Sequence, residues 1–300
     1  MESIADWSAA RMAAAFRRGE ASPVDVLDAV LARIDAWEPR IHAMYLVHRE
    51  SARAAARESA ARWRAGRPLS VLDGVPITLK ENLHTKGDPA PLGTAASDLA
   101  PKAADSPPAA RAREAGCVIV GKTTMPDFGM LSSGLSSIHG VTRNPWRVDR
   151  NTSGSSSGAA AAAAAGYGPL HVGTDIGGSV RLPATHCGLF ALKPSLGRIP
   201  IHPPYMGRVA GPMTRTVHDA ALLLSALAKP DARDFMSLPY QPVDYAAQLE
   251  GLEARRLRIG LLTDMGVGSS PHPSVVAACE SAARALEAAG AVVEPMQSFL

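Results

Sequence analysis

The first 66 residues show the apolar periodicity of α-helices. Apolar side chains recur every three or four positions over residues 3–18, which predicts one helix there. Ser22 and Pro23 are typical of a helix start, because serine caps and proline fits the first turn. The apolar face that follows runs through Val24, Leu27, Val30, Leu31 and Ile34. Residues 48–66, rich in Ala, Arg and Glu, predict a third, more exposed helix. We expect all three helices to be structural elements that pack against the rest of the protein.

From residue 75 onward, short apolar runs of strand type alternate with helical segments. The predicted strands are residues 75–79, 117–120, 170–172, 189–193, 257–262 and 291–294. The predicted helices are residues 107–115, 159–165, 216–227 and 273–289. Such alternation predicts an α/β fold in which helices cover a sheet. The last strand, helix and strand form a βαβ-like unit.

Composition narrows the class of protein. The chain has 300 residues, of which 46% are hydrophobic and 20% charged, so it can bury a sizeable core. The net charge is only +3, and no Lys/Arg run interleaves with aromatic residues, which argues against a nucleic-acid partner. Three widely spaced cysteines indicate a reducing compartment. With no leader pattern and no apolar run long enough for a membrane span, the sequence predicts a cytoplasmic protein without a membrane partner.

One stretch organises the chain: residues 150–158, an alanine run at 159–165, and residues 173–181. Its two ends are serine-glycine turns. Glycine lets a ligand approach backbone N–H groups closely, so Ser179, directly after Ile176, Gly177 and Gly178, could share a cradle of donors with a bound carbonyl. Such a composition is more commonly a flexible linker. Here the helix-forming alanines and the strand at 170–172 indicate a turn–helix–strand–turn unit instead.

Two other motifs point to different chemistry. Residues 116–123 fit the phosphate-loop pattern G-x-x-x-x-G-K-[ST], but their four middle positions form a strand where that motif needs a loop. Residues 154–158 fit the nucleophile elbow G-x-S-x-G, yet the polar residues 147–152 are unsuited to the central strand that the elbow requires. The nine histidines show no metal-binding spacing, so no metal is expected.

Lys80 closes the apolar run at 75–79. A lysine at the end of a strand is usually a surface residue whose stem lies along apolar neighbours. The second interpretation is a buried lysine, whose charged form is disfavoured and which can then act as a base.

Taken together, these segments resemble the amidase signature family of serine hydrolases. The resemblance rests on residues 74–80, on Ser155-Ser156 before a small-residue helix, and on residues 173–184. The separations agree as well, with 75 positions from Lys80 to Ser155 and 24 from Ser155 to Ser179. Further similar segments are residues 143–146, 187–188, 192–195 and 211–215. The resemblance covers nearly the whole chain.

The resemblance implies a mixed β-sheet covered by helices on both faces, and a Ser–Ser–Lys triad. Ser179 would be the nucleophile, Ser155 the bridging hydroxyl after a cis peptide bond to Gly154, and Lys80 the base. The oxyanion and substrate would be held by Ile176, Gly177, Gly178, Gly129, Met130 and Leu131. Asp175, Arg181 and Ser156 are expected to brace the turns. The family's usual glycine-rich turn is altered here, with serine at 153 and 157 and alanine at 159.

We therefore expect one domain over residues 1–300, with a helical region 1–70, a signature core 71–215 and a βαβ-like extension 216–300. Family members usually continue further, so the usual C-terminal part is expected to be lacking. The predicted function is hydrolysis of a small or medium carboxylic amide to an acid and ammonia or amine, without a cofactor. The alternatives are a truncated, non-catalytic binding subunit and an A-type subunit of a tRNA-dependent amidotransferase. Whether the chain forms a homodimer is left open.

Overall fold

The computed structural model describes residues 3–298, and their contacts divide into two compact units. The first unit ends at Ala246 and the second begins at Ala247. The division expected from the sequence, with an extension that starts at residue 216, stays a prediction. That the chain acts as one domain stays a prediction.

A six-stranded sheet forms the centre of the first unit, in the order β1-β3-β2-β8-β10-β9. Its strands are β1 (Met44–Val47), β2 (Pro76–Lys80), β3 (Val118–Thr123), β8 (Leu170–Asp175), β9 (Phe190–Ala191) and β10 (Val209–Thr214). β2 runs parallel to β3 and β8, whereas the β1–β3, β8–β10 and β9–β10 pairs are antiparallel. The expected mixed sheet is confirmed.

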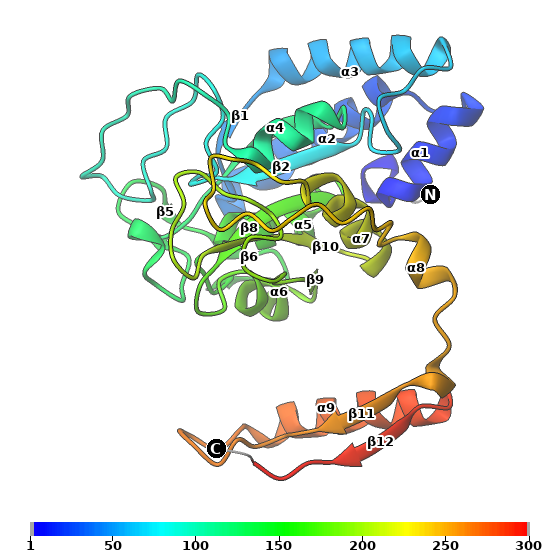
Figure 1. Ribbon diagram of the computed structural model, residues 1–300. Coiled ribbons are helices and arrows are strands. Elements are labelled where there is room, and N and C mark those ends of the chain that lie inside the picture. Colours follow the sequence, from blue (N-terminus) through cyan, green and yellow to red (C-terminus); the bar gives the residue numbers. More distant parts are fainter. Residues whose placement is uncertain (1–2, 299–300) are drawn as a thin grey trace. The chain divides into compact units, whose positions relative to one another are not determined.

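Seven α-helices of the first unit, counted over its described residues, surround this sheet (Figure 1). They are α1 (Ala9–Arg18), α2 (Pro23–Ile41), α3 (Arg49–Arg64), α4 (Pro107–Glu114), α5 (Ser157–Ala165), α6 (Arg181–Cys187) and α7 (Val217–Leu227). Residues 3–18 are not one helix as predicted. A short 3-10 turn, η1 (Ile4–Asp6), comes first, and α1 starts anew because the Ser8 side chain caps it by accepting a hydrogen bond from Arg11 N.

Two apolar clusters show that helices cover both faces of the sheet. One joins α1, α4 and α7 to inward side chains such as Ile77, Leu79 and Val172. The other joins α2 and α5 to Val118 and Val120. The expected cover of helices on both faces is confirmed.

The register of β2 and β3 places two lysines on opposite faces. Leu79 lies beside Lys122, and Lys80 lies beside Thr123. Side chains alternate along a strand, so Lys122 shares a face with Leu79 while Lys80 points to the other face. Both lysine side chains are fully buried.

Short elements between β3 and α5 form loops at one end of the sheet. They are η2 (Asp127–Gly129) and the strands β4 (Leu135–Ser136), β5 (Gly140–Val141), β6 (Arg143–Asn144) and β7 (Arg147–Asn151). β4 pairs with β5, and β6 with β7, in separate two-stranded sheets. β7 is therefore not a central strand.

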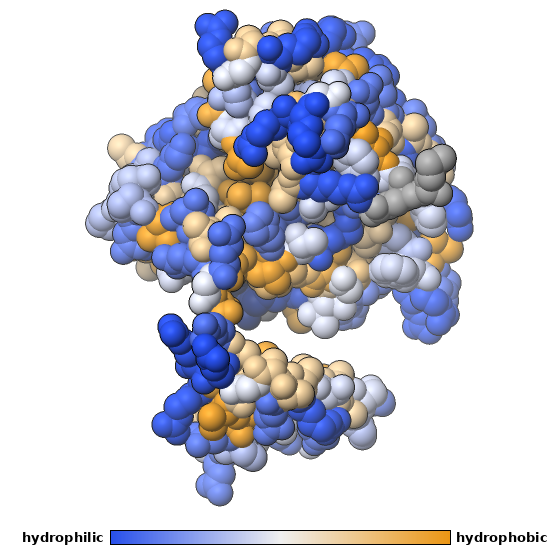
Figure 2. Space-filling model, turned by 90° about the vertical axis from the view of Figure 1, so that its right-hand side faces the viewer, coloured by the Kyte–Doolittle hydropathy of each residue, from blue (hydrophilic) through white to orange (hydrophobic). Residues whose placement is uncertain are grey.

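The second unit is the predicted strand–helix–strand. β11 (Arg258–Leu261) and β12 (Val292–Pro295) are parallel and are joined through α9 (Pro273–Ala288); α8 (Ala247–Glu250) and η3 (Ala254–Arg256) precede them. Among the described residues of α9, Ala283 is the one that is buried. Figure 2 shows apolar residues interspersed with polar ones over the visible surface. Exposed apolar side chains of this unit include Val267, Val275, Val292 and Met296.

No helix within residues 3–298 combines the length and the apolar character needed to cross a bilayer.

Candidate active site

The turn before α5 contains a cis peptide bond between Gly154 and Ser155, as predicted. A Cβ on Gly154 would lie 2.4 Å from the Ser133 carbonyl oxygen, so only glycine fits there. Ser153, where the resemblance implies glycine, has a left-handed backbone with φ of 64°. Its hydroxyl donates to the Ser132 carbonyl at 3.2 Å.

Lys80 ends β2 directly behind this turn. Its Nζ lies 2.8 Å from Ser155 Oγ and 3.0 Å from Ser156 Oγ, and donates to both. The pKa of Lys80 is lowered to about 7, mainly by burial and also by the Arg208 charge, against the opposing influence of Asp175 and Glu81. The interpretation of Lys80 as a surface residue is wrong. At neutral pH a large share of this amine is unprotonated.

Ser156 joins the two serine-glycine turns. Its backbone N–H donates to the Ser179 carbonyl at 3.1 Å. Its hydroxyl donates to the Thr174 carbonyl and accepts from the Thr174 N–H, each at 3.2 Å. A Cβ on Gly173 would lie 2.6 Å from Ser156 Oγ, which explains the glycine on β8. The bracing role predicted for Ser156 is confirmed.

The second turn is organised by Asp175, the last residue of β8. Its carboxylate accepts hydrogen bonds from the N–H groups of Gly178 at 2.8 Å and Val180 at 3.0 Å. It also pairs with Arg181 through two contacts of 3.0 and 3.1 Å. The predicted Asp175–Arg181 brace is confirmed. The Gly178 N–H is directed at Asp175, and the oxyanion role predicted for Gly178 stays a prediction.

Most of the predicted site residues meet around one cavity of about 460 Å³. Its wall includes Ser155, Ser179, Ile176, Gly177, Gly129, Met130 and Leu131. Lys80 is not in the wall; it reaches the cavity through Ser155. Gly178 also lies outside the wall.

A larger cavity of about 700 Å³ lies beside α2 and β1. Its wall, as far as the described residues form it, holds Glu38, Tyr45 and His139 but no serine, cysteine or lysine. Its one threonine, Thr124, contacts the His42 and Ala43 carbonyls and Thr142 Oγ1 and not the side chain of a base, so the chemistry favours the smaller cavity.

Sequence reasoning did not single out three polar residues of the smaller cavity: Asn82, Tyr205 and Arg208. Asn82 Nδ2 donates to Thr174 Oγ1 at 3.0 Å. Arg208 directly precedes β10, whose first residue, Val209, pairs with Asp175. The sequence feature that could have identified Arg208 is its position as a charged residue next to a buried strand, which adjoins the Ser179 turn.

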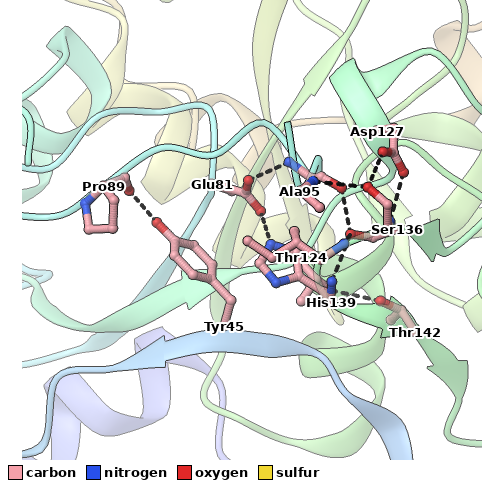
Figure 3. Close-up of polar contacts among 12 residues, drawn as sticks. Tyr45, Glu81, Pro89, Ala95, Thr124, Asp127, Ser136, His139 and Thr142 are labelled. Carbon is pink, nitrogen blue, oxygen red and sulfur yellow. Dashed lines mark hydrogen bonds and ion pairs between the residues drawn. The ribbon is translucent and has the colours of Figure 1, made fainter. Parts of the chain in front are cut away.

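Glu81, the residue after Lys80, contacts His139 among the polar contacts that join the loops after β2 and β3 (Figure 3). This fully buried carboxylate accepts from Gly93 N at 2.5 Å and lies 2.7 Å from His139 Nε2. The His139 ring in turn lies against Tyr45, with centroids 5.1 Å apart. On the same loops Asp127 binds the backbone N–H of Ser137 at 2.9 Å. The loop carrying Gly129, Met130 and Leu131 is therefore fixed to the end of β2.

The competing motifs do not form the sites that they suggest. Residues 118–123 of the phosphate-loop pattern are the buried strand β3, and Lys122 Nζ donates to the Leu83 carbonyl. Residues 154–158 follow β7, which belongs to a two-stranded sheet and not to the central one. Over residues 3–298, no three His, Cys, Asp or Glu side chains gather where they could hold a metal ion.

With this geometry in view, comparison with known proteins places the chain in a family. The family model named Amidase matches residues 25–298. The chain belongs to the amidase signature family, whose members share this fold.

Among curated proteins, the chain is similar to the A-subunit of the glutamyl-tRNA(Gln) amidotransferase of Chloroflexus aggregans (strain MD-66 / DSM 9485). The two are 40% identical over 287 residues, which cover 93% of this chain and 58% of that protein. An acylamidase of Rhodococcus erythropolis is 36% identical over 292 residues, covering 95% and 60%. The chain spans about three fifths of the length of these relatives.

Among solved structures, the native peptide amidase from Stenotrophomonas maltophilia has a TM-score of 0.88 at 33% identity, covering 97% of this chain and 62% of that one. A bacterial aryl acylamidase of the amidase signature family has a TM-score of 0.89 at 32% identity, covering 97% and 61%. These likenesses agree with the mixed sheet and its helical cover.

Proposed function

We propose that this chain is the catalytic part of an amide hydrolase that uses Ser179, Ser155 and Lys80. The single observation that carries the proposal is the contact of 2.8 Å between the buried Lys80 amine and Ser155 Oγ. Ser155 and Ser179 both line the cavity of about 460 Å³. A serine hydroxyl needs a base to become a useful nucleophile. A lysine whose pKa is about 7 can be that base at neutral pH.

In the proposed reaction Ser179 Oγ attacks the amide carbon and forms a C–O bond. Its proton passes to Ser155 Oγ while the Ser155 proton passes to Lys80 Nζ, because a hydroxyl donates and accepts at once. When the C–N bond breaks, the proton returns through Ser155 to the nitrogen, and ammonia or an amine leaves. Water then cleaves the acyl-enzyme to give the carboxylic acid and restores the Ser179 hydroxyl.

The backbone of the Ser179 turn would stabilise the oxyanion. We assign the donors to the N–H groups of Ile176, Gly177 and Ser179, since the Gly178 N–H is directed at Asp175. The exposed apolar side chains of Met130 and Leu131 line the same cavity and would contact the apolar part of a small-molecule amide. No step requires a cofactor.

A second candidate is one component of an amidotransferase complex. The similarity to the A-subunit of glutamyl-tRNA(Gln) amidotransferase favours it. In that case the amide would be cleaved within a complex, and the isolated chain would turn over slowly.

The proposal is tested by treating the protein with a fluorophosphonate probe and measuring its intact mass, followed by peptide mapping. We expect one adduct, on Ser179, that is absent from Ser179→Ala. A matched control is Ser51→Ala, because Ser51 lies exposed on α3 outside the cavity. An adduct on another serine, or none on the wild-type protein, would contradict the proposal. Ammonia release from amides by the chain alone would favour the hydrolase over the amidotransferase component.

A further inference from the structure

Arg208 occupies a special position in the cavity of the proposed active site. It lies directly before β10, at the end of that strand where Val209 pairs with Asp175, and the Ser179 turn begins there. Its side chain lines the same cavity as Ser155 and Ser179. Any molecule whose carbonyl reaches Ser179 therefore has Arg208 close by.

The guanidinium of Arg208 has no carboxylate partner among the described residues. None of the ion pairs formed within residues 3–298 includes it. Of the described residues in the cavity wall, Asp175 is the one carboxylate, and both of its oxygens are occupied by Arg181 and by backbone N–H groups. Arginine can donate five hydrogen bonds and stays charged, so this half-buried cation is uncompensated.

Arg208 is nevertheless held in place. Its Cζ lies 4.6 Å from the centroid of the exposed Tyr205 ring. Its backbone N–H donates to the Tyr205 carbonyl at 3.0 Å, which closes a turn between the two residues. A guanidinium stacked on a ring keeps its edges free for a planar anion.

The charge of Arg208 also reaches the proposed base. It lowers the pKa of Lys80, and burial lowers the pKa of Arg208 itself. The first effect is that of a positive charge near Lys80, and the second is that of burial, which disfavours the charged form of Arg208. Because no carboxylate pairs with Arg208 among the described residues, its charge makes this side of the cavity electropositive.

We propose that Arg208 is a specificity-determining residue that binds a carboxylate of the substrate, so that the preferred amides carry a carboxylate. This inference rests on the proposed function, and names its substrate class. The planar guanidinium matches a carboxylate in two parallel hydrogen bonds, and such charge-assisted pairs contribute roughly 10- to 100-fold in binding. The carboxylate can belong to the acyl part or to the departing amine.

Matched pairs of amides test the proposal and show whether the recognised carboxylate belongs to the acyl part or to the departing amine. For the acyl side, the pair is succinamate and its uncharged isostere 4-oxopentanamide. For the amine side, the pair is 4-acetamidobenzoate and 4-acetamidoacetophenone. The kcat/KM values of each pair are measured for the wild type, Arg208→Gln, Arg208→Lys and Arg57→Gln. Arg57 is the control, because it lies exposed on α3 outside the cavity. The assays are run at about pH 9, where Lys80 is mostly neutral in every variant.

We expect the wild type to prefer the carboxylate member of one pair by about 10-fold or more, mainly through a lower KM. Arg208→Gln should abolish that preference, Arg208→Lys should keep part of it, and Arg57→Gln should keep all of it. Equal preference in the wild type and Arg208→Gln, or no preference in the wild type, would overturn the proposal.

A binding measurement separates this proposal from the proposed function. Calorimetric titration of Ser179→Ala with succinate needs no catalysis. Binding that is lost on adding Arg208→Gln supports the carboxylate site even where no amide is hydrolysed. If no amide is hydrolysed, the carboxylate-site proposal is overturned when succinate does not bind, or when its binding is unaffected by Arg208→Gln.

Discussion

Two buried lysines on neighbouring strands have very different surroundings. Lys80 on β2 and Lys122 on β3 are both fully buried, and the pKa of each is lowered to about 7, mainly by burial. Lys80 faces α5 and contacts two serine hydroxyls. Lys122 points to the opposite face and donates to the Leu83 carbonyl. Acidic residues at 81, 88 and 105 raise its pKa against the effect of burial.

The difference shows that a lowered pKa does not by itself identify a base. What separates the two lysines is the partner: a hydroxyl can pass on a proton, whereas a backbone carbonyl cannot. The two lysines also differ in their connection to the active-site cavity, because Ser155 links Lys80 to the cavity that Ser179 lines. Lys122 lies outside that cavity. We therefore assign catalysis to Lys80 and packing to Lys122.

The largest expected effect is on activity. Lys80→Met should lower kcat/KM for amide hydrolysis by about 10²- to 10⁴-fold, the usual loss when a general base is removed. Lys122→Met should stay within about threefold of the wild type, because this lysine has no contact with the cavity. Circular dichroism of both variants controls for folding. Equal losses in two folded variants would remove the distinction between the lysines.

A second expected effect is on stability, where the two lysines should behave alike. Each has a pKa of about 7 in the folded protein against an ordinary value of 10.5. Between these values the unfolded chain holds a proton that the folded chain does not, so the free energy of unfolding rises with pH. Below about pH 7 both states are protonated, and that gain is absent. Urea unfolding between about pH 7 and 10 should show a smaller rise for either methionine variant, and the smallest for the double variant. An unchanged rise in Lys122→Met would mean that Lys122 is not neutral when folded.

The smallest expected effect concerns Glu81, whose charge raises the pKa of both lysines. Glu81→Gln should therefore lower the pKa of Lys80 and move the acid limb of the activity profile to lower pH, by less than about one unit. Arg208→Gln should move the same limb to higher pH. The measurement is kcat/KM against pH for both variants. Shifts in the same direction would contradict the assigned charges.

Much of the fold could be predicted because it follows local rules. The Ser22 cap, the apolar face of α2 and the strand runs at 75–79 and 170–172 each depend on neighbouring residues alone. The cis peptide bond and the Asp175–Arg181 brace came from the family resemblance and are confirmed.

The remaining features depend on contacts between distant residues. The direction of the Gly178 N–H is set by the Asp175 carboxylate, which a motif does not reveal. The place of Arg208 beside Ser179 follows from the pairing of β8 with β10. The division into units at Ala246 follows from contacts between residues that are distant in the sequence, which local patterns do not reveal.

The central claim, that Lys80 activates Ser179 through Ser155, is tested most directly by the rate of fluorophosphonate labelling of Ser179 against pH. We expect a rate that rises with pH through about 7 and then levels off in the wild type and in Lys122→Met. In Lys80→Met the rate should be low and lack this rise. A rise near pH 7 that persists in Lys80→Met, or disappears in Lys122→Met, would show that Lys80 is not the base that activates Ser179.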